Sequence, residues 1–519
     1  MSVQNSTPIW ADVQFPRYER LTRSGRFDVV VLGGGITGLS AAYFLKQAGK
    51  KVCLLEKNRL GQGDTGHTTA HLTCVTDVRF RDLVKSFGRE QAALTWYAGS
   101  VALDLIEKIV VENEIACQFH RTAGFLHAAL EGEEDESEDL KSEAELAREL
   151  GFDADFVDRA PVVGKPAMRI GDQGKFHPAA YLAGLARLVD GDGSAIYEQS
   201  EVSDVEADPL VVVANDRRIE CDYLVVATHV PLMGKSGLIS ASLLQTKLAP
   251  YSSYVLGGSL PRGLAPDVSL WDTSDPYYYL RIDAGRDFDR VIFGGQDHKT
   301  GQETDTEARY QKLEAILARI LPAAKIDHRW SGQVIQTNDG LPFIGESSDR
   351  QFVATGFNGN GFTFATLAAM MARDAMLGRE NPWQELFSVD RKKIRGGAWD
   401  YIKENLDYPR YLVGDWLARP KRMAPSDLER GEGKIIKLDG QRMACSRDRN
   451  GQIHKVSAIC THLGCLVRWN GAEQTWDYPC HGSRFQPSGE VIAGPAESPL
   501  TPIDPPQESR EKRKSSAVK

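Results

Sequence analysis

A glycine-rich turn near the start of the chain constrains the fold more than any other feature of the sequence. Residues 28–32 read Asp-Val-Val-Val-Leu, a β-branched run typical of a buried parallel strand. Residues 33–38 follow as Gly-Gly-Gly-Ile-Thr-Gly, and residues 39–50 carry apolar side chains at helical spacing. Residues 51–56 form a second apolar run that ends in an acid. A G-x-G-x-x-G pattern between a strand and a helix predicts a Rossmann-like α/β unit.

This turn has the chemistry of a diphosphate-binding site. Gly33 allows the tight turn, Gly35 lets the backbone approach a pyrophosphate, and Gly38 lets the helix pack closely on the strand. The start of the helix adds unpaired N–H groups and the positive end of the helix dipole. Glu56 ends the second strand, where a carboxylate accepts hydrogen bonds from ribose hydroxyls. We therefore expect FAD or NAD here, and an acid at this position disfavours a 2′-phosphate.

The segment that follows favours FAD over NAD. Residues 59–71 form a long loop rich in glycine and hydroxyl side chains, where a plain NAD-binding fold would enter another helix. This loop resembles the second cofactor loop of flavoproteins similar to glycine oxidase and D-amino-acid oxidase. Further segments resemble the strand that meets adenine, the strand that closes the FAD domain, and the strand–loop–helix that wraps the isoalloxazine. These segments are residues 201–203, 222–228, 340–345 and 353–363.

The resemblance covers about residues 27–380 and implies an FAD site assembled from distant parts of the chain. A second helix N-terminus, near Gly361, would favour negative charge on the reduced flavin. The residues expected at the cofactor are Gly33, Gly35, Ile36, Thr37, Gly38, Glu56, Lys57, Thr68, Thr69, Val202, Thr228, Gly356, Gly361, Phe362 and Thr363.

The expected fold class is α/β with an all-β C-terminal domain, and the resemblance implies that an inserted sheet lobe covers the substrate. The FAD part would comprise residues of about 27–77, 170–230 and 331–380. The substrate lobe would comprise about 80–160 and 231–330. The other expected parts are an N-terminal extension (1–26), a linker (381–425), a small β domain (426–505) and a disordered basic tail (506–519).

The second lobe holds the candidates for substrate contact. Residues 277–281 and 291–295 alternate as in neighbouring strands, and in the family this sheet covers the substrate pocket. Tyr279 and Arg281 are candidates for holding a substrate carboxylate, because arginine offers a bidentate fork. A structural ion pair explains Arg281 at least as well. His298 is a further candidate.

Two observations limit what the sequence says about the substrate. His229 and Tyr251 are possible pocket residues, but a structural histidine is the more common case and only geometry could decide. Relatives often carry an arginine just before the segment aligned with residues 337–340, where this chain has Gln333-Val-Ile-Gln336. This departure leaves an amino-acid substrate open, and no acid–base pair is assigned from the sequence.

A second chemical signal lies near the end of the chain, where three of the eight cysteines crowd together. Short runs at residues 434–438, 442–446 and 453–458, separated by turn signals, predict a small β domain. Within it, residues 460–465 read Cys-Thr-His-Leu-Gly-Cys and residues 479–485 read Pro-Cys-His-Gly-Ser-Arg-Phe. These segments resemble the two loops of a Rieske domain, in which two cysteines and two histidines hold a [2Fe–2S] cluster.

The Rieske resemblance implies metal ligands at Cys460, His462 and His481. The family's remaining ligand is the first cysteine of a Cys-x-Cys-His box, and this chain has Tyr478 at that position. The disulfide positions of the family fall on Cys465 and Cys480.

Tyr478 leaves several interpretations open, because a phenolate is a harder and bulkier ligand than a thiolate. In the preferred one, the cluster is lost and a Cys465–Cys480 disulfide helps to hold the fold. In the second, one of these two cysteines replaces the missing ligand. In the third, Tyr478 itself binds iron. A zinc site is a fourth alternative, which the Rieske-like flanking sequence disfavours.

Composition and charge limit the partners. The 62 basic and 71 acidic residues give a net charge of −9 without a large cationic face, so we expect no nucleic-acid partner. No apolar run approaches the roughly 20 residues that cross a bilayer, and no signal peptide begins the chain, so we expect a cytoplasmic protein without a membrane span. The remaining cysteines are expected to be buried small hydrophobes: Cys53, Cys74, Cys117, Cys221 and Cys445.

Together the two resemblances imply an FAD-dependent oxidoreductase with a C-terminal Rieske domain. The implied reaction is the oxidation of a small amine, amino acid or related C–H donor, with electrons passing through the Rieske site to an unknown redox acceptor. In the alternative, the Rieske-like domain has lost its cluster and serves as a structural or docking module. The expected partners are a small-molecule electron donor and that acceptor.

Overall fold

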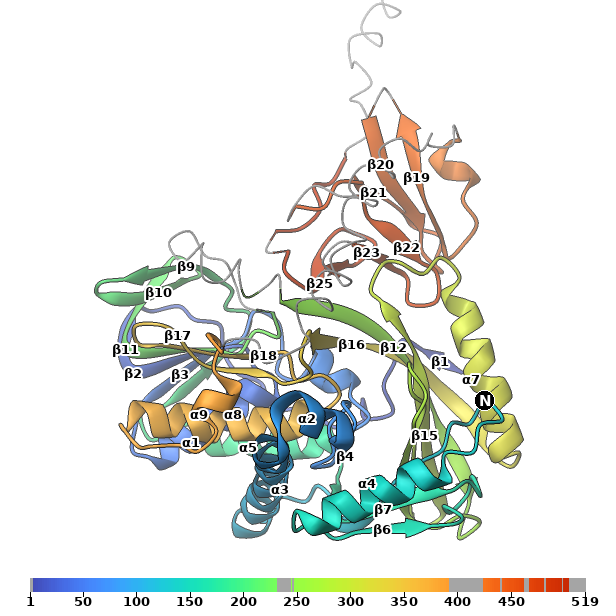
Figure 1. Cartoon of the computed structure of the whole chain (residues 1–519). Coiled ribbons are helices and arrows are strands. Elements are labelled where there is room, and N and C mark those ends of the chain that lie inside the picture. The colour runs from blue at the N-terminus through green and yellow to red at the C-terminus, as the bar shows by residue number, and fades with distance from the viewer. Residues whose placement is uncertain are drawn as a thin grey trace, which may run out of the picture. The chain divides into compact units, whose positions relative to one another are not determined.

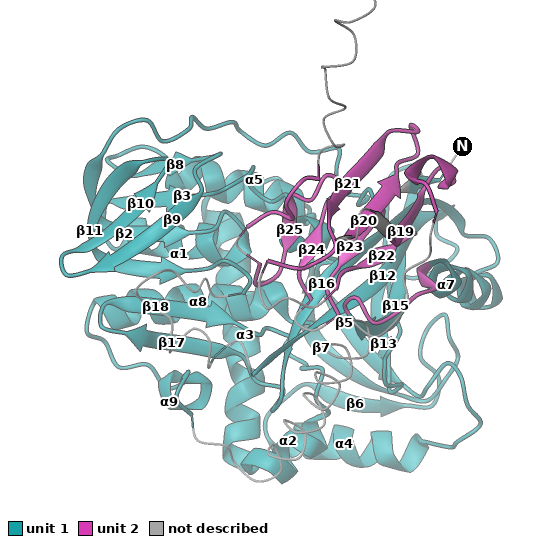
Figure 2. Ribbon diagram, turned by 90° about the horizontal axis from the view of Figure 1, so that it is seen from above, with its two compact units in different colours: residues 1–299, 307–405 teal, residues 300–306, 406–519 magenta. Residues whose placement is uncertain are grey.

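The chain folds into two compact units, shown in different colours in Figure 2. Unit 1 comprises residues 1–299 and 307–405, and unit 2 comprises residues 300–306 and 406–519. The structure is a computed structural model. It describes residues 3–230, 244, 247–391, 423–438, 441–461, 466–479, 482–496 and 498–503.

The first sheet of unit 1 is the cofactor sheet expected from the sequence. Its eight strands are β2 (Gly25–Leu32), β3 (Val52–Leu55), β8 (Ala195–Tyr197), β9 (Val202–Ala207), β10 (Leu210–Ala214), β11 (Arg217–Val226), β17 (Phe343–Ser348) and β18 (Gln351–Thr355). The order is β17-β18-β11-β2-β3-β8, and β10 joins β9 to β11. Strands β18, β11, β2, β3 and β8 run parallel, which places the ends of β2 and β11 at one edge.

Helices cover one face of this sheet (Figure 1). They include α1 (Ile36–Gln47), α5 (Pro178–Val189), α8 (Gly361–Met376) and the short α9 (Gln384–Phe387). Helix α1 contacts β2, β3, α5 and α8, and its residues from Ile36 to Leu45 are all buried. A helix that is buried on most sides carries mainly apolar or small side chains, as α1 does from Ile36 to Leu45.

The second sheet of unit 1 has ten strands. They are β1 (Gln4–Asn5), β4 (His71–Leu72), β5 (His120–His127), β6 (Ala154–Val157), β7 (Ala167–Lys175), β12 (Leu248–Pro261), β13 (Val268–Asp272), β14 (Tyr279–Asp283), β15 (Phe288–Lys299) and β16 (Lys325–Thr337). The order is β1-β16-β12-β15-β14-β13-β5-β7-β4, with β6 beside β7. The predicted pairing of β14 with β15 is confirmed, because Tyr279 faces Gly294 and Arg281 faces Ile292.

Four helices accompany the second sheet and the connection between the sheets. They are α2 (Phe80–Phe87), α3 (Arg89–Glu112), α4 (Ser137–Glu149) and α7 (Thr306–Ile320). Helix α4 packs on β6 and β7, while α3 contacts both β7 and α8. The two sheets are therefore built from alternating stretches of the chain, and residues 331–337 belong to the ten-stranded sheet as part of β16.

Unit 2 holds two small antiparallel sheets, as expected for the C-terminal domain. One contains β19 (Glu432–Leu438), β20 (Gln441–Arg447) and β21 (Ile453–Ser457). The other contains β22 (Arg468–Asn470), β23 (Thr475–Asp477), β24 (Arg484–Phe485) and β25 (Val491–Ala493). The loop of residues 300–306 also belongs to this unit, because the Ala472 N–H donates to Thr306 Oγ1 at 3.2 Å.

Together the units confirm the predicted fold class, α/β followed by a small antiparallel β domain. Most of the predicted linker (381–425) and the predicted tail (506–519) lie outside the described residues. In the described part of the chain, none of the helices is long and apolar enough to cross a membrane. The five scattered cysteines are buried, as expected: Cys53, Cys74, Cys117, Cys221 and Cys445.

Candidate functional site

The glycine turn lies at the carboxyl end of a parallel strand, because β2 ends at Leu32 and α1 begins at Ile36. Gly33 has a φ of +102°, and a Cβ at this position would overlap the Ala227 carbonyl oxygen of the neighbouring chain segment. A Cβ at Gly38 would overlap the Gly33 carbonyl oxygen. Both positions therefore need glycine for the backbone to turn and pack as it does.

Glu56 lies over this turn. The Gly34 N–H donates to Glu56 Oε2 at 2.7 Å, and the Asn58 N–H donates to Oε1 at 2.7 Å. Burial raises the pKa of the Glu56 carboxyl, against the lowering effect of these two hydrogen bonds. Each carboxylate oxygen keeps acceptor capacity, so the geometry fits an acid that bonds ribose hydroxyls.

The second cofactor loop contacts the start of α1. It contains a short 3₁₀ helix, Asp64–His67, and Thr65 Oγ1 accepts a hydrogen bond from the Ile36 N–H at 3.3 Å. Thr65 Oγ1 would also lie 2.9 Å from a Cβ at Gly35. Thr37 is buried in the first turn of the helix. The two loops that the sequence assigned to the cofactor are therefore adjacent.

The N-terminus of α8 is open at Gly361. Outside its own helix, no heavy atom of the described chain lies within 4 Å of the position of a Cβ there. Phe362 and Thr363 point into the fold instead: Phe362 belongs to the main hydrophobic core, and Thr363 Oγ1 donates to the Thr73 carbonyl at 3.2 Å. Gly356 has a φ of +72°. The open helix end is thus the part of this segment that could face the isoalloxazine.

The other predicted cofactor residues occupy strand ends and loops around the same sheet. Val202 begins β9, and Thr228 follows β11, where its hydroxyl donates to the Val230 carbonyl at 2.9 Å. The hydroxyls of Thr68 and Thr69 contact atoms within their own loop, and Lys57 is exposed.

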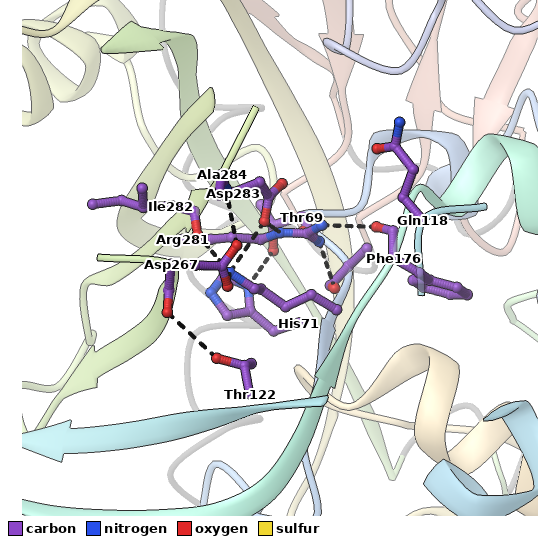
Figure 3. A network of polar contacts seen from close by, with 12 residues as sticks. Thr69, His71, Gln118, Thr122, Phe176, Asp267, Arg281, Ile282, Asp283 and Ala284 are labelled. Carbon is purple, nitrogen blue, oxygen red and sulfur yellow. Dashed lines mark hydrogen bonds and ion pairs between the residues drawn. The ribbon is translucent and has the colours of Figure 1, made fainter. Parts of the chain in front are cut away.

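Arg281, a candidate for holding a substrate carboxylate, is committed to the fold. Its guanidinium is 2% exposed and donates to Asp283 Oδ1 at 2.8 Å. It also donates to the backbone carbonyls of Thr69 at 2.9 Å, Ala70 at 2.7 Å and Phe176 at 2.7 Å. Figure 3 shows Arg281 among Thr69, Phe176 and Asp283. These bonds give it a structural role, because they tie the second cofactor loop to the ten-stranded sheet.

Lys175 extends the same network. Its side chain is 0% exposed, and its ammonium group contacts Asp267 and, at 3.3 Å, Asp283. It also donates to the Ile282 carbonyl. Burial lowers the pKa of Lys175, while the two carboxylates act in the opposite direction. The positive charges of this region are therefore neutralised within the protein.

The other two catalytic candidates, His298 and Tyr279, also form hydrogen bonds within the protein. His298 Nε2 lies 2.9 Å from Tyr254 Oη, and its Nδ1 lies 2.8 Å from the Lys299 carbonyl, so both ring nitrogens are engaged. Tyr279 Oη lies 2.9 Å from Ser253 Oγ, and burial raises the pKa of Tyr279.

His229 and Tyr251, the other possible pocket residues, lie in different places. His229 follows β11 and places Nε2 3.3 Å from Asp64 Oδ2 in the second cofactor loop. Its φ of +63° is unusual for a residue with a side chain. Tyr251 lies within β12, opposite Lys299 and Val334.

Sequence reasoning missed two carboxylates beside these residues. Asp77 accepts a hydrogen bond from the Gly359 N–H at 2.8 Å and one from Tyr277 Oη at 3.3 Å. Asp297, near the end of β15, accepts a hydrogen bond from Ser253 and interacts electrostatically with Asp77. Neither acid lies in a recognisable sequence motif: Asp77 lies a few residues after the second cofactor loop, and Asp297 lies two residues after a glycine pair.

The candidate metal centre lies in unit 2 and is described only in part. Cys460 and Tyr478 are both buried and share one hydrophobic core. The Tyr478 N–H donates to the Ser483 carbonyl, and the Gly482 N–H donates to the Tyr478 carbonyl, both at 2.8 Å. The other expected ligand and disulfide positions, His462, Cys465, Cys480 and His481, lie outside the described residues.

Two family models match the chain. The model "FAD dependent oxidoreductase" matches residues 28–375, and the model "Rieske [2Fe-2S] domain" matches residues 419–504. The chain belongs to the FAD-dependent oxidoreductase family and carries a C-terminal Rieske domain. The two families indicate FAD and a [2Fe–2S] cluster as cofactors.

Individual relatives agree with this assignment. The Bacillus subtilis protein YhfW, named as a Rieske 2Fe-2S iron-sulfur protein, is 34% identical over 94% of this chain and 96% of its own length. The gamma-glutamylputrescine oxidoreductase of Escherichia coli is 24% identical over 74% of this chain and 90% of its own. The solved glycine oxidase of Geobacillus kaustophilus shares the fold, with a TM-score of 0.59 and 21% identity over 71% of this chain and 99% of its own.

The described residues fit FAD well and the Rieske cluster less completely. A dinucleotide with a flavin ring needs a turn of glycines, an acid for its ribose and an open helix end, and the chain has these at Gly33 and Gly38, at the half-buried Glu56 and at the start of α8. In the Rieske domain, Cys460 matches a family ligand, but a phenol stands at Tyr478, where the family has a thiolate. Of the family's two thiolate ligands, the described residues therefore supply Cys460 alone.

Proposed function

We propose that the chain oxidises the C–N bond of a small amine or amino acid with FAD. Bound FAD would supply a two-electron acceptor for a hydride from the substrate carbon. The observation that carries the proposal is the hydrogen bond from Gly359 to Asp77 at 2.8 Å, because it fixes a polar group beside the loop that leads into α8. In the resembling flavoproteins that loop wraps the isoalloxazine, so a substrate amine would meet polar side chains there.

The chain's own residues would then bind and position the reactants. The N–H groups at the start of α1 would hold the diphosphate, and Glu56 would accept ribose hydroxyls. The open N-terminus of α8 would favour negative charge on the reduced ring. Tyr277 and Tyr279, 5.9 Å apart between ring centroids, would cover the substrate from the ten-stranded sheet.

The names of two relatives support this substrate range. Gamma-glutamylputrescine oxidoreductase is named for an amine and glycine oxidase for an amino acid. The test is anaerobic mixing of the purified full-length chain with a panel of amines and amino acids. Loss of the flavin band at about 450 nm with any of them supports the proposal. A flavin that none of them reduces contradicts it.

We further propose that the C-terminal domain takes part in electron transfer, as membership of the Rieske family supports. Because Tyr478 stands at the position of a cysteine ligand, the test is whether the chain holds an iron–sulfur cluster. An assay that finds about two irons and two sulfides per chain supports the proposal. A preparation that contains flavin but neither iron nor sulfide contradicts it.

A further inference from the structure

An acidic site lies beside the loop that leads into α8. It consists of four residues: Asp77, Asp297, Tyr277 and Tyr279. Asp77 follows the second cofactor loop, Tyr277 and Tyr279 lie just before and at the start of β14, and Asp297 lies in β15. Asp77 accepts hydrogen bonds from both Gly359 and Tyr277. Asp77 and Tyr277 lie close to Gly359, because a Cβ there would be 2.6 Å from both Asp77 Oδ1 and Tyr277 Oη.

Two buried oxygen atoms at and beside this site have no hydrogen-bond donor among the described residues. Asp297 Oδ1 is buried and has no hydrogen-bond partner in the part of the chain that the structure describes. Asn360, next to Gly359, is 4% exposed and donates its Nδ2 to the Val75 carbonyl at 2.8 Å. Its Oδ1 also lacks a partner among the described residues. Buried acceptors are normally paired, so these atoms point to a ligand that brings N–H donors.

The cations that could have served these acceptors are used elsewhere. Arg281 donates to Asp283 and to three backbone carbonyls. Lys175 is buried against Asp267 and Asp283. His71, whose ring lies 5.7 Å from that of Tyr279, stays neutral, because burial first and then Arg281 lower its pKa to about 3.

The raised pKa values of Asp297 and Tyr277 are those expected of acidic groups that lack a nearby positive charge. Burial, helped by the charges of Asp77 and Asp275, raises the pKa of Asp297 to about 7, against the lowering effect of the hydrogen bond from Ser253. The pKa of Tyr277 is raised by burial and by the charges of Asp77 and Asp297. A cation placed between the carboxylates would relieve both effects.

We propose that the acidic site binds the protonated nitrogen of an amine whose reacting carbon carries no carboxylate. Asp77 and Asp297 would accept hydrogen bonds from the ammonium group, and the aromatic faces of Tyr277 and Tyr279 would add a cation–π contribution. An α-carboxylate would repel the two acids, and the arginine that the described residues place in this region, Arg281, is already committed to Asp283 and three carbonyls. The inference rests on the proposed FAD function and narrows its substrate class to simple cationic amines.

Butylamine and norvaline test the inference directly, because norvaline is butylamine with a carboxylate on the reacting carbon. The full-length, FAD-loaded chain is mixed anaerobically with each compound, and the rate of flavin reduction is followed against concentration. We expect butylamine to reduce the flavin at least about tenfold more efficiently than norvaline, because Asp77 and Asp297 repel the added carboxylate.

Variants then assign the selectivity to the site. Asp297→Asn and Asp77→Asn should each weaken the apparent affinity for butylamine by about ten- to hundredfold and narrow its advantage over norvaline. The matched control is Asp287→Asn, which changes an exposed acid in the turn between β14 and β15. Flavin content and melting temperature are measured for all three variants, and Asp297→Glu should restore part of the selectivity.

The outcomes separate this inference from the proposed function. The inference is supported if the chain prefers butylamine to norvaline and if this preference is smaller in Asp297→Asn and Asp77→Asn but unchanged in Asp287→Asn. Equal or faster reduction by norvaline, with no change in the site variants, overturns it while leaving the oxidoreductase assignment in place. A flavin that no amine or amino acid reduces contradicts the proposed function and the inference together.

Discussion

Replacing Arg281 with methionine distinguishes a structural arginine from a substrate anchor. Methionine keeps much of the side-chain volume but removes every hydrogen bond of the guanidinium. Asp283 would lose its 2.8 Å partner, and the carbonyls of Thr69, Ala70 and Phe176 would lose their donors. The site is 2% exposed, so water cannot readily replace these bonds.

The expected cost follows from this geometry. Removing one partner of a buried ion pair costs about 3–5 kcal/mol. Asp283 keeps Lys175 at 3.3 Å, so here the cost comes mainly from the three buried carbonyls that lose their donors. Unit 1 has about 400 residues, and an unfolding entropy of about 2.1 cal/mol/K per residue converts this cost to a melting temperature lower by roughly 4–6 °C. Flavin retention should fall as well, since two of the lost bonds hold the second cofactor loop.

The assay is thermal unfolding of the full-length protein, followed by flavin fluorescence and circular dichroism. Arg26→Met is the matched control, because Arg26 pairs with Glu220 and Asp222 at a surface where its side chain is 58% exposed. That change should cost less than about 1 kcal/mol. A melting temperature for Arg281→Met equal to that of the control, combined with a selective rise in KM for an amino acid, would refute the structural role.

Other predictions concern the acidic site, the glycine turn and the Rieske box. The kcat/KM for butylamine should rise as pH increases through about 7, where Asp297 ionises, and this rise should be absent in Asp297→Asn. Because the folded-state pKa of Asp297 is raised, its stability contribution is lost as pH rises toward about 7, so Asp297→Asn should raise the melting temperature at pH 8 but not at pH 4. Gly38→Ala should abolish flavin binding, measured by absorbance at about 450 nm, because its methyl group overlaps the turn carbonyl. In the control Gly25→Ala, at the start of β2, the methyl group meets only Phe27 at 3.8 Å, and the variant should bind flavin normally. Tyr478→Cys should raise iron and sulfide per chain by supplying the softer ligand, and unchanged iron would count against the missing-ligand argument.

The cofactor fold could be predicted from the sequence because its signal is local. A β-branched strand, three glycines and an apolar helix lie within about 25 residues, and each residue type has one steric reason to be there. The small β domain was predictable for the same reason, since its strands and turns alternate over short distances.

The substrate side of the site could not be predicted in this way, because its contacts join distant residues. Arg281 bonds to the carbonyl of Thr69, 212 positions away in the sequence, and a backbone acceptor leaves no residue signature. Asp77 meets Tyr277 and Gly359 across 200 and 282 positions. Only the folded structure shows that the Arg281 guanidinium is already hydrogen-bonded and that, among the described residues, Asp297 Oδ1 and Asn360 Oδ1 are left without donors.

The central claim is that this chain is an FAD enzyme that takes electrons from an amine. Anaerobic titration of the purified full-length protein with butylamine tests it most directly. The account predicts a yellow protein whose absorbance at about 450 nm disappears in proportion to the amine added. A yellow protein whose spectrum is unchanged by every amine and amino acid tried, or a folded protein that takes up no FAD, would contradict it.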